Sequence, residues 1–114
     1  MQIFTRTSND IHSNGIHIVA IAGSLDSTTS PEAQKSLTAV LAGAKKVALD
    51  FSELDYISSA GLRVLLGAAK QLRASGGKLG MFGLNQSVRE VFEISGFSSI
   101  LSVYQSEAEA LGAL

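Results

Sequence analysis

The sequence contains no cysteine, which excludes a disulfide framework and any metal site built on cysteine ligands. Its formal net charge is only −1, so no basic field favours binding to nucleic acid or to an anionic membrane. No apolar run approaches the roughly 20 residues that a membrane-spanning helix needs. Residues 1–6 lack the basic start and long apolar core of a signal peptide. The chain is therefore predicted to be a soluble, cytoplasmic protein.

Signatures of catalysis are also scarce. The two histidines, His12 and His17, have no partner at a spacing typical of metal ligands. No serine lies in a G-x-S-x-G elbow, and the 11 glycines form neither a G-x-x-x-x-G-K-[ST] loop nor a G-x-G-x-x-G fingerprint. Asp50 and Asp55 precede Ser59 and could form an acid/base pair, but carboxylates at a strand end are more often caps or solvated side chains. We expect no enzyme activity, no cofactor and no bound metal.

What the 114 residues do contain is an alternation of strand-like and helix-like segments over the length of one domain. Strands are predicted at 2–7, 16–22, 46–51, 78–84 and 100–104. Helices are predicted at 31–44, 59–74, 86–95 and from 106 onward. The first two strands flank Asn14-Gly15, a strong turn signal, and should form an antiparallel hairpin. This order predicts one α/β domain over residues 1–114, with a mixed, mostly parallel sheet of four to five strands and helices packed against it.

Two of the predicted helices carry clear signals. In the helix at 59–74, apolar side chains recur at a spacing that predicts one buried face. These residues are Leu62, Leu65, Leu66, Ala69 and Leu72. In the helix at 31–44, the predicted inward-facing residues are Ala33, Leu37, Val40, Leu41 and Ala44. Ser30 stands before Pro31 and is the predicted N-cap of this helix.

Ser58 and Ser59 stand where a short loop after the strand at 46–51 leads into the helix at 59–74. Either serine could be the N-cap, which accepts a hydrogen bond from a backbone N–H of the first turn. The same geometry favours an anion, because the free N–H groups and the positive end of the helix dipole point toward it. Two interpretations follow. One is a plain N-cap, and the other is a hydroxyl that is phosphorylated and whose phosphate is held by the helix terminus.

Four short segments occur in an order and on elements that resemble a known family. They are Gly23-Ser24-Leu25-Asp26, Val47-Ala48-Leu49-Asp50-Phe51-Ser52, Ile57-Ser58-Ser59-Ala60-Gly61-Leu62 and Gly76-Gly77-Lys78. Together they resemble a STAS domain and, more narrowly, the bacterial anti-sigma-factor antagonists. The segment from Val88 to Phe97 is similar to the third helix of that family and its glycine stop. The resemblance covers essentially the whole chain.

The resemblance implies a partner-switching regulator and not an enzyme. Members of the family bind a cognate anti-sigma factor that is also a serine kinase with a histidine-kinase-like ATPase fold, and a metal-dependent phosphatase reverses the phosphorylation. In the family motif Asp-Ser-(Ser/Thr)-Gly-Leu, the modified serine stands two residues before the glycine. Gly61 matches that glycine, so the predicted phosphorylation site is Ser59. Ser58 replaces the usual Asp and is the second candidate, while Ala60 replaces the second hydroxyl.

The resemblance also implies that the loop at 23–27 lies beside the modified serine and forms part of the partner surface. The predicted partner-binding residues are Ser24, Asp26, Ser27, Ser58, Ala60, Gly61 and Arg63. Asp26 could instead have a capping or turn role ahead of the first helix, and Arg63 could belong to a solvated helix face. Two other functions are open at this point. One is a STAS scaffold or sensor subunit without reversible phosphorylation, and the other is a serine-dependent enzyme built on Ser59, for which no base is placed.

Overall fold

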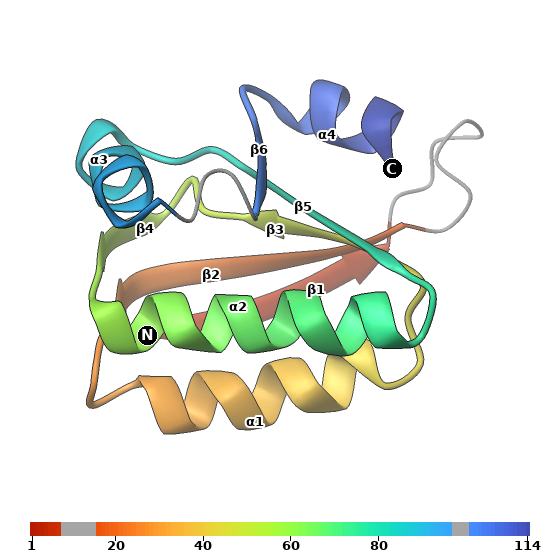
Figure 1. The fold of residues 1–114 in the computed structure, drawn as a ribbon, viewed down its shortest axis with the longest axis horizontal. Helices are drawn as coiled ribbons and strands as arrows, with labels where there is room; N and C mark the ends of the chain where they lie inside the picture. Colours follow the sequence, from red (N-terminus) through yellow and green to blue (C-terminus); the bar gives the residue numbers. More distant parts are fainter. Residues whose placement is uncertain (8–15, 97–100) are drawn as a thin grey trace.

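The computed structural model describes residues 1–7, 16–96 and 101–114. Within these ranges the strands are β1 (Gln2–Thr7), β2 (His17–Leu25), β3 (Lys46–Asp50), β4 (Leu54–Ile57), β5 (Lys78–Phe82) and β6 (Ser102–Tyr104). The helices are α1 (Ser30–Leu41), α2 (Ser59–Ala74), α3 (Gln86–Ser95) and α4 (Glu107–Ala113). Figure 1 shows the helices packed against a twisted sheet, as the α/β prediction requires.

The central sheet has the strand order β1-β2-β3-β5-β6. The β1 strand is antiparallel to β2, whereas β3, β5 and β6 add to the sheet in parallel. The predicted mixed, mostly parallel sheet is therefore confirmed, and so is the antiparallel pairing of the first two strands. Asn14 and Gly15, where the hairpin turn is predicted, lie outside the described residues, as does His12.

The strand β4 is not predicted from the sequence. It pairs in parallel with the last residues of β2, which runs beyond its predicted end. Leu54 and Ile57 are buried while Asp55 and Tyr56 between them are exposed, so β4 lacks the strict alternation that identifies a half-buried strand. Because β4 leads into α2, it determines where that helix begins.

Side chains of the parallel strands alternate between two apolar cores, one on each face of the sheet. The larger core lies under α1, α2 and α3 and includes Val19, Leu49 and Met81. The smaller core lies under α4 and includes Ile18 and Ala48. Figure 1 shows α1 and α2 side by side on one face, with α4 on the opposite face. Both faces of the middle strands are thus covered by helices.

The buried face of α2 differs in part from the predicted one. Its buried side chains are Leu62, Val64, Leu65, Ala68 and Leu72. Leu66 and Ala69 are only half-buried, although Ala69 still packs against the larger core, so they lie at the edge of the buried face and not at its centre. The helix packs against α1 as well as against the sheet. Because α1 covers the side of α2 that carries Val64 and Ala68, these two residues are buried as well.

The helix α1 differs from its prediction at both ends. Its N-cap is Thr29, and Ser30 is the first helical residue, so the prediction of Ser30 as N-cap was wrong. The Ser30 hydroxyl donates instead to the carbonyl oxygen of Asp26 and is thereby used up in the preceding loop. The helix ends at Leu41, before the predicted end, and Val40 is half-buried and not fully inward-facing.

The strand β5 also ends earlier than predicted. Gly83 has a φ of 80°, a left-handed conformation that ends the extended backbone after Phe82. The helix α3 has the predicted bounds, and β6 begins at Ser102. Residue 100, the predicted start of that strand, lies outside the described residues.

Candidate functional site

Ser58 is the N-cap of α2. Its backbone is extended, and its hydroxyl oxygen accepts a hydrogen bond from the N–H of Gly61 at 3.3 Å. Its carbonyl oxygen accepts a further bond from the N–H of Leu62 at 2.9 Å. The structure thus gives the plain capping role, which the sequence left open between two serines, to Ser58.

Ser59 is the first residue of α2, and its side chain is exposed. Among the hydrogen bonds of the described residues, none involves its hydroxyl and none joins the Ser58 hydroxyl to a carboxylate or a histidine. Neither serine is therefore held by a base, as a nucleophilic serine would be. Of the two residues, Ser59 is exposed and Ser58 is half-buried.

The loop between β2 and α1 lies directly beside this serine pair. The N–H of Ser58 donates to the carbonyl oxygen of Leu25 at 2.9 Å, and Leu25 is the register partner of Ile57 in the β2–β4 pairing. The end of β2, which contains Ser24, and the loop that follows it, which contains Ser27, are therefore tied to the start of α2 by backbone hydrogen bonds. The structure brings together the two segments that the resemblance places side by side.

Asp26 organises this loop. Its Oδ1 atom accepts hydrogen bonds from the N–H of Thr28 at 2.9 Å and of Thr29 at 3.1 Å. Its carbonyl oxygen accepts from the N–H of Ser30 at 2.8 Å. These bonds form a turn ahead of α1, which is the turn role that the sequence left open for Asp26; they do not cap the helix, whose N-cap is Thr29. Its half-buried side chain fixes the shape of the loop, and contact of Asp26 with a partner stays a prediction.

Gly61 is buried at the point where α2 comes closest to the end of β2. A Cβ atom added at Gly61 would lie 2.6 Å from the carbonyl oxygen of Leu25 and 2.8 Å from Cγ1 of Ile57. Any larger residue would push the helix away from the strand. Close packing, and not contact with a partner, is therefore what the position of Gly61 requires.

The other predicted partner-binding residues differ in exposure. Ser27 and Arg63 are exposed, and Ser24 and Ala60 are half-buried. With the exposed Ser59, these residues lie around the start of α2. Tyr56 of β4, the register partner of Ser24, is 52% exposed in the same region. A partner that approaches Ser59 therefore meets small side chains together with the larger side chains of Tyr56 and Arg63.

A family model described as the STAS domain matches residues 8–110, which is most of the chain. The chain belongs to the STAS domain family. It is 46% identical over 101 residues to BtrV of Bordetella bronchiseptica, a proposed anti-sigma factor antagonist, and the match covers 88% of this chain and 87% of BtrV. The resemblance found in the sequence motifs is therefore confirmed.

Solved structures agree with the fold. An anti-sigma factor antagonist from Mycobacterium paratuberculosis superposes with a TM-score of 0.81 at 22% identity, covering 98% of this chain and 93% of that one. The phosphorylated form of SpoIIAA, a Bacillus cell fate determinant, superposes with a TM-score of 0.65 at 18% identity. The match covers 96% of this chain and 98% of SpoIIAA. At these identities the likeness establishes the STAS fold and nothing more.

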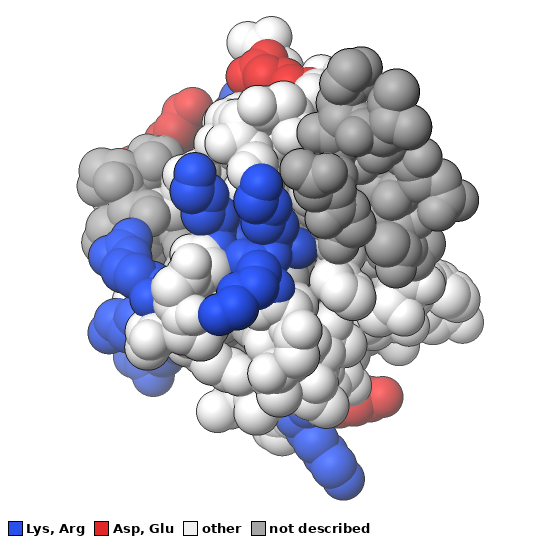
Figure 2. Space-filling view, turned by 90° about the vertical axis from the view of Figure 1, so that its right-hand side faces the viewer, with Lys and Arg blue, Asp and Glu red and all other residues white. Residues whose placement is uncertain are grey.

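Charge is unevenly distributed over this STAS domain. Figure 2 shows lysine and arginine side chains gathered over the end of the molecule where α2 finishes and where β3 and β5 begin. Lys46 and Lys78 are the first residues of those strands and register partners, and Arg73 lies in the last turn of α2. The start of α2 lies at the other end of this helix, near the acidic residues Asp55 and Asp26. Ser59 is thus remote from the basic end.

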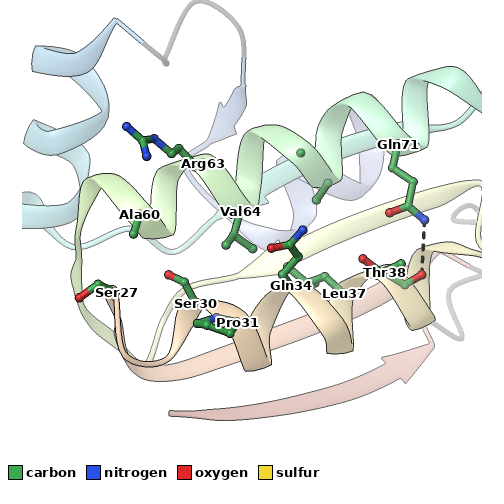
Figure 3. Close-up of a pocket in the computed structure, with 12 residues that line it drawn as sticks. Ser27, Ser30, Pro31, Gln34, Leu37, Thr38, Ala60, Arg63, Val64 and Gln71 are labelled. Carbon is green, nitrogen blue, oxygen red and sulfur yellow. Dashed lines mark hydrogen bonds between the residues drawn. The ribbon is translucent and has the colours of Figure 1, made fainter.

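A groove lies between α1 and α2 and runs along both helices from the level of Ser27 and Ala60 (Figure 3). It has a volume of about 500 Å³. We call it the α1–α2 groove; its lining residues are Ser27, Ser30, Pro31, Gln34, Leu37, Thr38, Ala60, Arg63, Val64, Gly67, Ala68 and Gln71. The groove is not predicted from the sequence. The signal that could have indicated it is the recurrence of small residues on α2 at Ala60, Gly67 and Ala68.

Over 1–7, 16–96 and 101–114, no group of three or more His, Asp or Glu side chains is arranged to hold a metal ion. None of the helices in these ranges has the length and apolar character that crossing a membrane requires. What the arrangement offers chemically is an exposed hydroxyl at a helix N-terminus, bordered by a well-ordered loop.

Proposed function

We propose that this STAS domain is an anti-sigma-factor antagonist that is switched by phosphorylation of Ser59. In the unmodified form it binds a cognate anti-sigma factor, which is also a serine kinase with a histidine-kinase-like ATPase fold. Phosphorylation by that kinase weakens the complex, and a metal-dependent phosphatase restores it. The observation that carries the proposal is the division of roles between two adjacent serines. Ser58 is used as the N-cap, and Ser59 is exposed and without a hydrogen bond among the described residues.

The start of α2 can accept a phosphate without unfolding. A phosphoserine adds about −1.5 to −2 charges, and the N-terminus of a helix stabilises negative charge through its free N–H groups and its dipole. Arg63 follows Ser59 by four residues and lies one turn along the same side of the helix. Its exposed guanidinium is a second source of positive charge for the phosphate. The modified domain should therefore keep its fold.

The same phosphate is costly for a partner that packs on this surface. A partner that packs closely over Ser59 would have to desolvate the phosphate or leave a gap. A hundredfold weaker complex requires only about 2.7 kcal/mol, which is less than burying an unpaired charge can cost. Weakened binding thus needs no conformational change.

Affinity measurements with variants at the two serines test this proposal. The partner is the anti-sigma-factor kinase of the same organism that is recovered with the wild-type protein from native lysate. We expect Ser59→Ala to bind it like wild type, and Ser59→Asp to bind at least tenfold more weakly while giving an unchanged circular dichroism spectrum. Ser58→Ala is the matched control and should bind within a few-fold of wild type. If Ser59→Asp binds as tightly as wild type, the switch is wrong, and a scaffold or sensor role without reversible phosphorylation takes its place.

A further inference from the structure

The α1–α2 groove combines a buried apolar floor with a polar rim that is uncharged except for Arg63. The floor is formed by Leu37, Val64 and Ala68, whose exposed fractions are 2%, 8% and 5%. The rim carries hydroxyl and amide groups from both helices: those of Ser27, Ser30, Gln34, Thr38 and Gln71. In Figure 3 the side chains of Val64, Gln34 and Leu37 point into the space between the helices, and Arg63 points away from it. Arg63 is the one charged residue among those that line the groove, and it lies near the Ala60 end.

The two ends of the groove differ. At one end, Nε2 of Gln71 donates to the carbonyl oxygen of Thr38 at 3.4 Å and bridges α2 to α1 (Figure 3). At the other end lie Ser27 and Ala60, and Ala60 directly follows Ser59. A protein that places its active site over Ser59 therefore also covers this end of the groove.

Gly67 gives an independent reason to regard the groove as a binding site. It lies in the middle of α2, and a Cβ atom added there would have no neighbour within 4 Å. Packing within the described residues therefore does not require a glycine at this position. Glycine in a helix interior is nonetheless unfavourable compared with alanine. The absence of a side chain at Gly67 keeps the space between α1 and α2 open.

We propose that an apolar side chain of the partner kinase is seated in the α1–α2 groove when the complex forms. This inference rests on the proposed function, because it takes the kinase that modifies Ser59 as the occupant. The groove is then the anchor of the complex, and Ser59 beside one end of it is the point at which phosphorylation acts. The partner surface extends from the start of α2 along both helices toward Gln71.

The chemistry of the lining determines what fits. A volume of about 500 Å³ lies in the lower half of the ~300–1,000 Å³ range of ligand pockets, which suits one or two inserted side chains. The floor favours an aliphatic or aromatic side chain such as Leu, Ile, Met or Phe. The amides of Gln34 and Gln71 can hydrogen-bond to the backbone of the inserted segment. A segment with a lone apolar residue and uncharged neighbours is therefore the expected occupant.

Filling the groove from within tests the proposal. Gly67→Leu places an apolar side chain in the open space, and Gly67→Gln fills it with a flexible polar one. Gly112→Leu is the matched control, because Gly112 is also an exposed helical glycine with nothing within 4 Å of an added Cβ, but it lies in α4. Each variant is first checked for cooperative unfolding in urea. Affinity for the partner kinase and the steady-state kinetics of Ser59 phosphorylation are then measured.

We expect Gly67→Leu to bind the kinase at least tenfold more weakly than wild type, with a raised KM and an unchanged kcat for phosphorylation. Gly67→Gln should show the same direction, and Gly112→Leu should stay within twofold of wild type. If the kinase binds and phosphorylates both Gly67 variants like wild type, the groove proposal is overturned and the proposed function stands. If wild type neither binds nor is phosphorylated, the proposed function itself fails. If wild type sediments as a dimer that Gly67→Leu dissociates, a second copy of the chain is the occupant, and the kinase is not.

Discussion

Gly61 and Gly67 lie in the same helix, and replacing each by alanine should have opposite effects on stability. At Gly61 the added Cβ atom would lie 2.6 Å from the carbonyl oxygen of Leu25 and 2.9 Å from its Cγ atom. At Gly67 it would meet no atom within 4 Å. Gly61→Ala therefore tests whether α2 approaches β2 as closely as the structure has it, and Gly67→Ala is the internal control.

The magnitude follows from two opposing contributions. Alanine in place of a helical glycine stabilises by roughly 0.5–1 kcal/mol, and this contribution applies to both variants. Overpacking a filled site costs about 1–3 kcal/mol, and occasionally more, and this contribution applies only to Gly61→Ala. Gly67→Ala should thus be more stable than wild type by about 0.5–1 kcal/mol. Gly61→Ala should be less stable than Gly67→Ala by at least about 1–3 kcal/mol. The reason is that the carbonyl oxygen of Leu25 belongs to the backbone and cannot rotate aside as a side chain could.

Urea denaturation followed by circular dichroism measures both values. The slope m should be the same for all three proteins, so that the shift in midpoint reports stability. If Gly61→Ala unfolds at the same urea concentration as Gly67→Ala or at a higher one, the close approach of α2 to β2 is wrong. The placement of Ser59 beside the loop between β2 and α1 would then be wrong as well, because it depends on the same contact between α2 and the end of β2.

Three further predictions concern the serines, the core and the chemistry. Ser58→Ala should lower the free energy of unfolding by about 0.5–2 kcal/mol, because it removes an N-cap, whereas Ser59→Ala should change it by less than about 0.5 kcal/mol; equal losses would contradict the assignment of the cap. Leu65→Ala should cost about 2–5 kcal/mol and clearly more than Leu66→Ala, because only Leu65 is fully buried; the reverse order in urea melts would place the buried face of α2 wrongly. The purified domain should not hydrolyse ATP in a phosphate-release assay, since it has no phosphate-binding loop motif; turnover that is lost on mutating this chain would refute the regulatory role.

The arrangement of strands and helices could be predicted because its signals are local. Apolar periodicity indicates the helices, and β-branched runs indicate the middle strands. The strand β4 has only four residues, and Asp55 and Tyr56 at its centre are both exposed, so its pairing with β2 decides its structure and the pattern does not. The buried face of α2 depends on α1 in the same way. Val64 and Ala68 are buried because a helix distant in sequence packs beside them.

The position of the candidate site could be predicted from the sequence, but the separate roles of its two serines could not. The position of two serines at a strand-to-helix junction is visible in the sequence, and family resemblance favours Ser59. Which serine caps the helix depends on the direction of one side chain, and only the hydrogen bond from Gly61 to Ser58 decides it. The α1–α2 groove was missed because a groove is formed by two helices together. The small residues of α2 indicate it only once α1 is placed beside them.

The most direct test of the account is to map the phosphate after incubating the protein with its partner kinase and ATP. Tandem mass spectrometry of wild type, Ser58→Ala and Ser59→Ala identifies the modified residue. We predict one phosphate on Ser59 in wild type and in Ser58→Ala, and no phosphate in Ser59→Ala. Phosphate on Ser58, or phosphate that persists in Ser59→Ala, would contradict the assignment of the capping and regulatory roles to these two serines.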